Sequence, residues 1–253
     1  MPLEQVLVLL AAAACAGWVD AVVGGGGLLQ LPAIMMIGLP PVEAMATNKL
    51  SSVFGTASAA VAYARTTKVD RQVALPGVVL ATLSAGLGAW AAAAISAEVL
   101  RPAVMVILLA VAAFVTLRPA MGAVPQPHLR TDARVVAAVA TAGVGIAFYD
   151  GIMGPGTGTF LIIAFTTILG LDFVSASASA KIINIGTNLG ALAVFTWQGH
   201  VHWGLGLGMA VCNVAGAQVG ARMALKRGAA FVRIVLLVMV AAMVIRLGWQ
   251  QFA

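Results

Sequence analysis

The feature that most constrains this chain is the recurrence of apolar runs of about twenty residues from one end to the other. A helix rises about 1.5 Å per residue, so about twenty apolar residues cross the roughly 30 Å hydrocarbon core of a bilayer. Only 9% of the 253 residues are charged, whereas soluble domains carry roughly 25%. So few charges cannot solvate the exterior of a water-soluble globule. The sequence therefore predicts an all-α polytopic membrane protein and excludes a cytosolic one.

Two of the apolar segments are too short to cross a bilayer comfortably, and each follows a glycine-rich break. The breaks lie at residues 24–27 and 154–158. Consecutive glycines weaken a helix by roughly 1 kcal/mol each, so we predict that the helix is interrupted at both places, near the membrane midplane. The apolar segments are expected at 3–23, 28–39, 44–64, 73–95, 98–117, 134–153, 159–171, 176–197, 203–224 and 229–248.

A polar stretch separates the fifth segment from the sixth. It runs from residue 118 to residue 134 and contains Pro119, Pro125 and Pro127, a composition typical of a linker. The sequence therefore predicts three units. A first transmembrane repeat covers residues 1–118, a linker covers 119–133, and a second transmembrane repeat covers 134–253.

The two halves are predicted to be repeats because scarce residue types recur at a fixed spacing. At an offset of 130, Asp20, Gly24 and Gly26 match Asp150, Gly154 and Gly156; at an offset of 132, Lys49, Gly88 and Arg101 match Lys181, Gly220 and Arg233. The charged matches carry the most weight in so apolar a chain. We interpret the isolated Gly88 and Gly220 as places where helices pack closely.

The distribution of basic residues predicts that the two repeats have opposite orientations. The loop after the third segment contains Arg65, Lys68 and Arg71, whereas its counterpart near His200 contains no Lys or Arg. The next pair of loops shows the reverse: the loop after the ninth segment is basic, whereas its counterpart after the fourth segment is not. Cytoplasmic loops of membrane proteins carry the excess of Lys and Arg, so corresponding loops face opposite sides. We expect a bacterial inner-membrane protein with a cytoplasmic linker and both termini outside.

Four ionisable residues lie within the apolar segments. They are Asp20 and Lys49 in the first half and Asp150 and Lys181 in the second. A charge at mid-depth costs about 2.5 kcal/mol or more, so each needs a reason. One interpretation is structural: Asp20 pairs with Lys49 and Asp150 with Lys181, or the side chains reach an interface. The other interpretation is that these residues belong to a functional site.

The functional interpretation combines these charges with the two breaks. Unpaired N–H groups at a helix N-terminus bind anions, and nearby lysines, hydroxyls and amides add donors. The result is a donor-rich, positively biased pocket suited to a small anionic substrate, in which Asp20 and Asp150 have a coupling or structural role. The candidate substrate-binding residues are Gly24, Gly25, Gly26, Gly27, Asn48, Lys49, Ser52, Gly154, Gly156, Thr157, Gly158, Thr159, Lys181, Asn184 and Asn188.

Other classes of function find little support in the sequence. Cys15 and Cys212 lie in apolar runs without the Cys and His neighbours of a metal site, so no metal and no cofactor are expected. The glycine breaks do not fit a nucleotide-binding loop. The basic pI of about 10.0 reflects membrane topology, not a nucleic-acid partner. No catalytic constellation lies within the segments, so an enzyme is not expected. The bilayer is the other expected partner, and a homodimer is left open.

The chain resembles the sulfite exporter TauE/SafE family of membrane transporters. In the first half the resemblance rests on residues 17–20, the break at 24–27, Pro32 and residues 47–49. In the second half it rests on Gly151, residues 154–160, Lys181 and Asn184. The resemblance implies movement of sulfur-containing anions such as sulfite or organosulfonates. The leading hypothesis is a secondary transporter that exports such an anion by alternating access. Alternatives are an anion-selective channel, a transporter of another small organic anion and, less favoured, an intramembrane enzyme.

Overall fold

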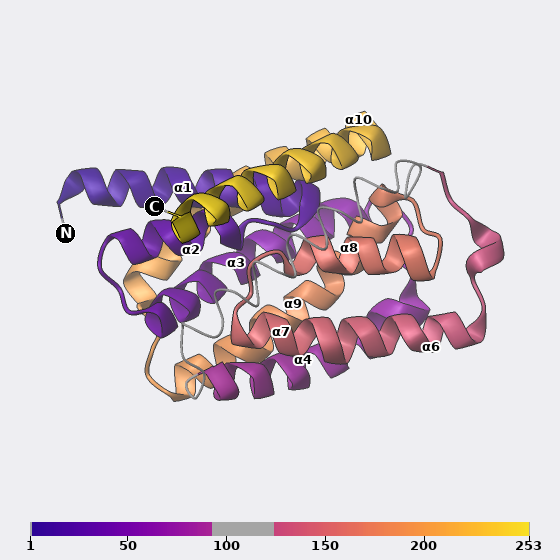
Figure 1. Cartoon of the computed structure of the whole chain (residues 1–253), viewed down its shortest axis with the longest axis horizontal. Helices are drawn as coiled ribbons and strands as arrows, with labels where there is room; N and C mark the ends of the chain where they lie inside the picture. The colour runs from indigo at the N-terminus through magenta and orange to yellow at the C-terminus, as the bar shows by residue number, and fades with distance from the viewer. Residues whose placement is uncertain (1, 93–123, 253) are drawn as a thin grey trace.

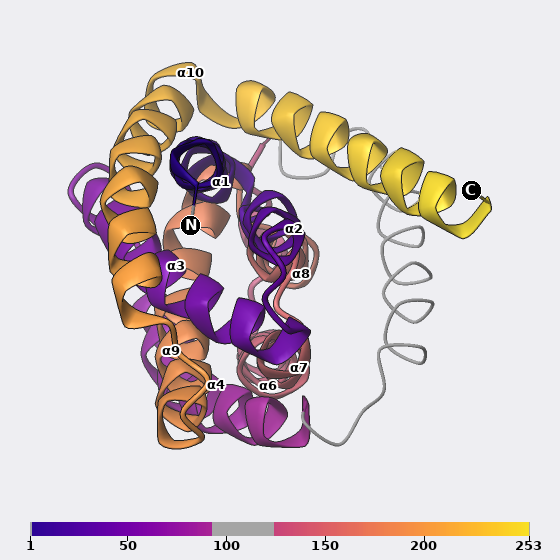
Figure 2. The same cartoon turned by 90° about the vertical axis from the view of Figure 1, so that its left-hand side faces the viewer.

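The computed structural model describes residues 2–92 and 124–252, and these residues form helices joined by turns, with no β-strand among them. Most helix axes follow the long axis of the molecule (Figure 1), and several are seen end-on in Figure 2. The predicted segment 98–117 lies outside the described residues. The helices are α1 (Leu3–Val23), α2 (Gly27–Met36), α3 (Pro41–Ala64), α4 (Arg71–Ala92), η1 (Pro127–Leu129), α6 (Asp132–Ala140), η2 (Thr141–Ile146), α7 (Ala147–Ile152), α8 (Thr157–Ile168), α9 (Phe173–Trp197) and α10 (Trp203–Phe252).

Helix lengths confirm the predicted class of all-α polytopic membrane protein. Five helical stretches among the described residues are long and apolar enough to cross a bilayer. The predicted segment 3–23 coincides with α1, and α6, η2 and α7 together form the continuous stretch predicted at 134–153. The remaining described segments agree with the prediction to within a few residues at each end.

Both predicted helix interruptions are present. After α1, Gly24 adopts a left-handed conformation with φ 77°, and its N–H donates to the Asp20 carbonyl at 2.8 Å. After α7, Gly154 and Gly156 have φ of +83° and +84°. Side chains rarely adopt positive φ, so glycine is required where the backbone must reverse. The helices that follow, α2 and α8, have 10 and 12 residues, too few to span a bilayer upright.

Each short helix turns back along the helix that precedes it. Figure 1 shows α2 returning towards the N-terminal end of α1 and α8 running opposite to α6 and α7. The two helical hairpins therefore enter the molecule from opposite ends. Neither short helix continues in the direction of its predecessor.

The tips of the two hairpins touch. A Cβ atom added to Gly24 would collide with the backbone of Gly158 and lie 2.7 Å from the Thr159 nitrogen. The Thr159 hydroxyl donates to the Val23 carbonyl at 2.7 Å, which satisfies one of the carbonyls freed where α1 ends. The two interruptions, distant in sequence, therefore form one backbone contact.

Glycines also allow close packing between helices of the two predicted halves. α4 packs on α7, and α1 packs on α10. A Cβ at Gly88 would meet the Phe148 carbonyl, and one at Gly220 would meet the Trp18 carbonyl. These two contacts occupy matching positions of the predicted repeats, and they confirm the packing role of both glycines. Such reciprocal contacts are expected between repeats related by a two-fold axis, and the inverted orientation itself stays a prediction.

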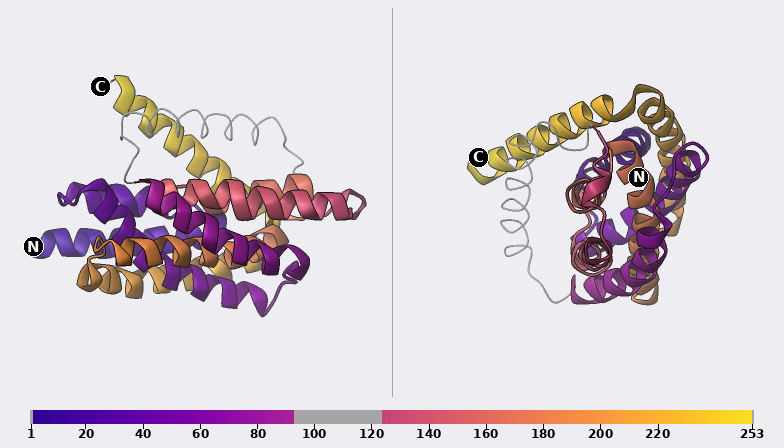
Figure 3. Two further views of the ribbon diagram at one scale, coloured as in Figure 1. Left: turned by 90° about the horizontal axis from the view of Figure 1, so that it is seen from below. Right: turned by 90° about the vertical axis from the view of Figure 1, so that its right-hand side faces the viewer.

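Different polar contacts lie at the two ends of the molecule. At one end the linker residue Arg130 pairs with Asp70, in the loop before α4, and donates to Gln72 at 2.7 Å. At the opposite end His202 contacts Glu43 at 2.6 Å. Both chain termini lie at this second end in Figure 1. α10 bends at Gly228, with φ 73° and ψ −166°, so that its last arm leaves the helix pack obliquely (Figures 2 and 3).

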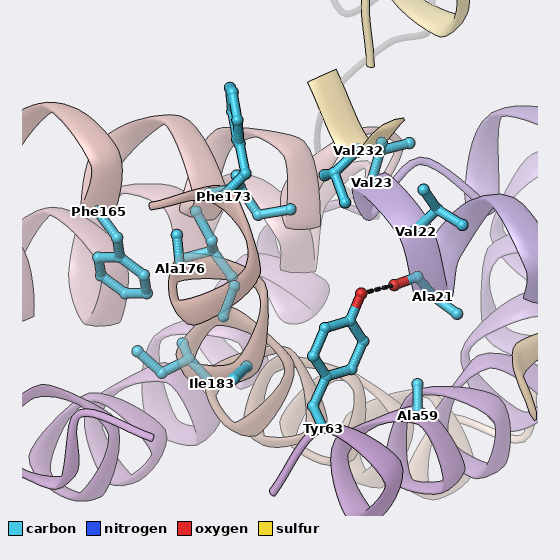
Figure 4. Close-up of a cluster of buried hydrophobic side chains, with 14 of the residues drawn as sticks. Ala21, Val22, Val23, Ala59, Tyr63, Phe165, Phe173, Ala176, Ile183 and Val232 are labelled. Carbon is cyan, nitrogen blue, oxygen red and sulfur yellow. Dashed lines mark hydrogen bonds between the residues drawn. The ribbon is translucent and has the colours of Figure 1, made fainter. Parts of the chain in front are cut away.

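The main apolar core joins both halves around the hairpins. It includes Val22 of α1, Tyr63 of α3, Phe165 of α8 and Ile183 of α9, all fully buried (Figure 4). The Tyr63 hydroxyl donates to the Ala21 carbonyl at 3.0 Å, within the last turn of α1. The broken end of α1 is therefore held in place by a side chain from α3.

The contact between hairpin tips predicts an intolerance of small additions. Gly158→Ala would force the tips apart, and we expect a loss of about 1–3 kcal/mol in stability, the usual effect of overpacking. Gly208→Ala is the matched control, because nothing lies within 4 Å of a Cβ at that helical position. Thermal unfolding of the purified proteins in detergent measures both. Equal stability of the two variants would show that the tips do not depend on this contact.

Candidate functional site

Two ion pairs lie near the interruptions, and each joins the two halves. Lys49 Nζ of α3 lies 2.6 Å from Asp150 Oδ2, and Lys181 Nζ of α9 lies 3.4 Å from Asp20 Oδ2. The lysine side chains are 4% and 0% exposed. The pairings within each half, Asp20 with Lys49 and Asp150 with Lys181, are therefore wrong as a structural interpretation. The partners are exchanged because each hairpin tip reaches the lysine-bearing helix of the opposite half.

Asp150 is held by groups from three parts of the chain. Its Oδ2 atom receives the Lys49 ammonium, and its Oδ1 atom accepts from the Thr157 hydroxyl at 2.6 Å. Thr157 is the first residue of α8. Negative charge is stabilised at a helix N-terminus, so the carboxylate lies where an anion is favoured. Only 2% of Asp150 is exposed.

Asp20 has a related but looser environment. Its carboxylate accepts from the Thr56 hydroxyl at 3.1 Å and from Lys181. The Lys181 ammonium also donates to the Asp20 backbone carbonyl, in the last turn of α1. A cation at a helix C-terminus is favourable, because the exposed carbonyls carry partial negative charge.

Lys49 occupies the equivalent position at the other interruption. A Cβ at Gly154, just after α7, would lie 3.3 Å from both Lys49 Nζ and Asp150 Oδ1. Each lysine thus neutralises an aspartate and lies at the end of a broken helix. The charges of the two lysines are balanced by the two aspartates, so the positive bias expected from the lysines does not arise from these four side chains. The positive ends left over are the N-termini of α2 and α8.

These two N-termini lie together near the centre of the molecule. Neither α2 nor α8 has a side-chain cap among the described residues. In place of a cap, the Leu28 N–H donates to the Gly25 carbonyl at 3.1 Å and the Thr157 N–H to the Gly154 carbonyl at 3.4 Å. A Cβ at Gly27 would lie 3.6 Å from Asn48 Nδ2 and 3.7 Å from the Pro155 Cα atom. Asn48 is 8% exposed, and its Oδ1 atom is buried without a partner among the described residues.

The other predicted site residues divide into two groups. Gly24, Gly158 and Thr159 form the contact between hairpin tips and act in the structure. Gly25, Gly26 and Gly156 are buried in the turns.

Asn184 accepts from the Thr187 hydroxyl at 3.0 Å. Within the described residues no side-chain hydrogen bond connects Ser52, Asn184 or Asn188 to the ion pairs.

Sequence reasoning missed three polar residues. Thr56 lies seven residues after Lys49, on the same face of α3, a spacing that could have identified it. Gln30 and Asn213 form a buried amide pair, with Asn213 Nδ2 donating to Gln30 Oε1 at 2.8 Å. These two residues could have been noticed in the sequence, because side-chain amides are rare inside apolar segments. This pair fastens the short helix α2 to α10.

Comparison with known proteins supports the family suggested by these residues. A family model described as sulfite exporter TauE/SafE matches residues 9–247. The probable membrane transporter protein ORF9 of a Sinorhizobium species is 38% identical over 239 residues, 94% of this chain and 90% of the relative. The probable membrane transporter protein YfcA of Escherichia coli K12 is 33% identical over 244 residues, 96% of this chain and 90% of the relative.

A probable membrane transporter protein of Haemophilus influenzae is 32% identical over 252 residues, 96% of this chain and 98% of the relative. No solved structure matches the chain. The family match covers nearly the whole sequence, including both interruptions and all four buried charges. Together with the apolar helices, it identifies a multi-pass membrane transporter. The chain therefore belongs to the sulfite exporter TauE/SafE family.

Proposed function

We propose that this protein is a secondary transporter that exports a small sulfur-containing anion, such as sulfite or an organosulfonate, by alternating access. The observation that carries the proposal is the meeting of two uncapped helix N-termini, those of α2 and α8, beside a buried lysine. The description of the family supports the sulfur chemistry of the substrate.

The chemistry of the centre favours an oxyanion over a cation or a sugar. Backbone N–H groups at the start of a helix donate hydrogen bonds and carry partial positive charge. Lys49 adds an ammonium group and Asn48 an amide at the same place. In a medium of low dielectric these donors act more strongly than in water. A compact group with several acceptor oxygens, such as a sulfonate, can use several of them at once.

The arrangement of the hairpins supports alternating access. One hairpin enters from each end, and their tips meet at Gly24 and Gly158, where the Thr159 hydroxyl also donates to the Val23 carbonyl. A small rotation of one half against the other would open the centre to one side at a time. Export needs no coupled ion in principle, because a membrane potential of 100 mV, negative inside, drives each negative charge outward by about 2.3 kcal/mol.

We propose that the end of the molecule where Arg130 pairs with Asp70 faces the cytoplasm. The loop before α4 and the linker meet at this end, and the positive-inside rule places their basic residues inside. In a variant whose two native cysteines are replaced, we introduce Thr66→Cys or His200→Cys. A membrane-impermeant maleimide added to intact cells should label His200→Cys and spare Thr66→Cys. The reverse pattern would invert the proposed topology.

The role of the lysines is tested by removing them. Hydrogen bonds to charged groups contribute about 1.5–3 kcal/mol, so Lys49→Ala and Lys181→Ala should each weaken anion binding by roughly ten- to a hundredfold. Binding of sulfite to purified protein, measured by calorimetry, provides the readout.

Two further sets of variants separate binding from folding. Lys49→Ala with Asp150→Asn, and Lys181→Ala with Asp20→Asn, leave no buried carboxylate without its partner, and they should bind as weakly as the single variants. Lys68→Ala, in the loop before α4, should bind like the wild type. Wild-type affinity in both lysine variants would refute the assigned site.

The substrate and the mechanism are tested in proteoliposomes. The panel contains sulfite, sulfate, thiosulfate, taurine-like sulfonates and carboxylates. We expect saturable uptake of a sulfur-containing anion, with counterflow when the same anion is present on both sides. Unitary currents in a planar bilayer would instead indicate a channel. Preferential uptake of a carboxylate would assign the transporter to another class of organic anion.

A further inference from the structure

The carboxylate of Asp150 is bound in the way that the transported anion is proposed to be bound. It receives the Lys49 ammonium at 2.6 Å and the hydroxyl of Thr157, the first residue of α8, at 2.6 Å. It is almost fully buried. Asp150 therefore already supplies the centre with an anion of its own.

We propose that Asp150 is the proton-binding residue of this transporter: the substrate anion displaces the Asp150 carboxylate from Lys49, and the displaced carboxylate takes up one proton. This inference rests on the proposed function, because it concerns the same anion site. It predicts that one proton is bound with each anion and moves across the membrane with it. Transport of a monovalent anion is then electroneutral, so the outward concentration gradient of the anion drives export in place of the membrane potential.

The balance of charge requires the proton. The two lysines and two aspartates carry no net charge together, so an added anion would leave one uncompensated negative charge in a buried region. Such a charge is strongly unfavourable. A proton from the aqueous solution forms an O–H bond on Asp150, while Lys49 stays an ammonium ion and its ion pair passes from the carboxylate to the substrate. The loaded centre is then neutral.

The lysines of the two ion pairs differ in the number of acceptors that hold them. Lys181 has two acceptors, the carboxylate and the backbone carbonyl of Asp20, so it stays anchored to α1 if the carboxylate moves. Among the described residues Lys49 has a single hydrogen-bond acceptor, Asp150. An ammonium group has three donors, so Lys49 retains donors for a ligand.

Within residues 2–92 and 124–252, no other titratable group competes for this role around Asp150. The element packed most closely on α7 is α4, which presents Ala85 and Gly88 there; its only charged residue, Arg71, is its first. From α3 the carboxylate meets Lys49, and from α8 it meets Thr157. On α9 the only charged residue is Lys181, which is paired with Asp20.

The segments on either side of Asp150 add no competing charge. η2 contains no titratable residue, and the charges of α6 lie in its first turn. The neighbouring Tyr149 donates its hydroxyl to the Pro155 carbonyl at 2.8 Å. Asp150 is therefore the group whose protonation follows directly from displacement.

The test measures how anion affinity depends on pH. The probe is ethanesulfonate, which is fully ionised throughout, so any dependence arises in the protein. For the wild type, we expect the affinity for ethanesulfonate to fall about tenfold for each unit by which the pH is raised, over the range in which the unliganded Asp150 is ionised. This slope follows from the uptake of one proton on binding. Asp150→Asn should remove the dependence, Asp150→Glu should keep it, and Asp70→Asn, in the peripheral pair with Arg130, should match the wild type.

A second measurement needs no variant. Calorimetric titrations in buffers of different ionisation enthalpy report proton uptake directly, and we expect about one proton for each ethanesulfonate bound. In proteoliposomes carrying an internal pH indicator, inward flow of ethanesulfonate should acidify the lumen.

The outcomes separate this inference from the proposed function. Binding by the wild type that is independent of pH and takes up no proton would overturn the inference alone, as would unchanged pH dependence in Asp150→Asn. If the wild type binds neither ethanesulfonate nor any sulfur-containing anion of the panel at any pH, the proposed function fails and the inference fails with it.

Discussion

The structure depends on two buried ion pairs, each of which joins a lysine of one half of the chain to an aspartate of the other half. A buried ammonium or carboxylate without a partner costs several kcal/mol, so each half contains charges that only the other half can neutralise. Lys49 needs Asp150, and Lys181 needs Asp20. The two halves are thus held together at the centre of the apolar molecule by electrostatics, whereas small-residue packing joins their flanks.

The interruptions explain why these charges are needed at the centre. Breaking a helix exposes carbonyls at the end of one piece and N–H groups at the start of the next, so each break has a negative and a positive end. The lysines lie at the negative ends, after α1 and α7. The positive ends, at α2 and α8, are left without side-chain caps among the described residues. This division places the positive ends where the anion is proposed to bind.

Most of the fold could be predicted from the sequence, because its cause is local. Runs of apolar residues set the helices, and the glycines at 24–27 and 154–158 set the breaks. The ion-pair partners could not be predicted in this way. Asp20 is compatible with either lysine by composition and depth, and only the meeting of the hairpin tips places Lys181 beside it. The positions of Thr56, Gln30 and Asn213 carried a signal in the sequence, but their partners could not be predicted, because those depend on which helices touch.

The two ion pairs also differ in a way that bears on mechanism. Lys49 and Asp150 are in close contact and nearly inaccessible, whereas Lys181 and Asp20 are 3.4 Å apart and the Asp20 side chain is 14% exposed. The two pairs are thus in different states within one conformation. The tight pair is the one that the transported anion is proposed to open. In the looser pair Lys181 keeps a second contact, with the backbone carbonyl of Asp20, that does not depend on the carboxylate.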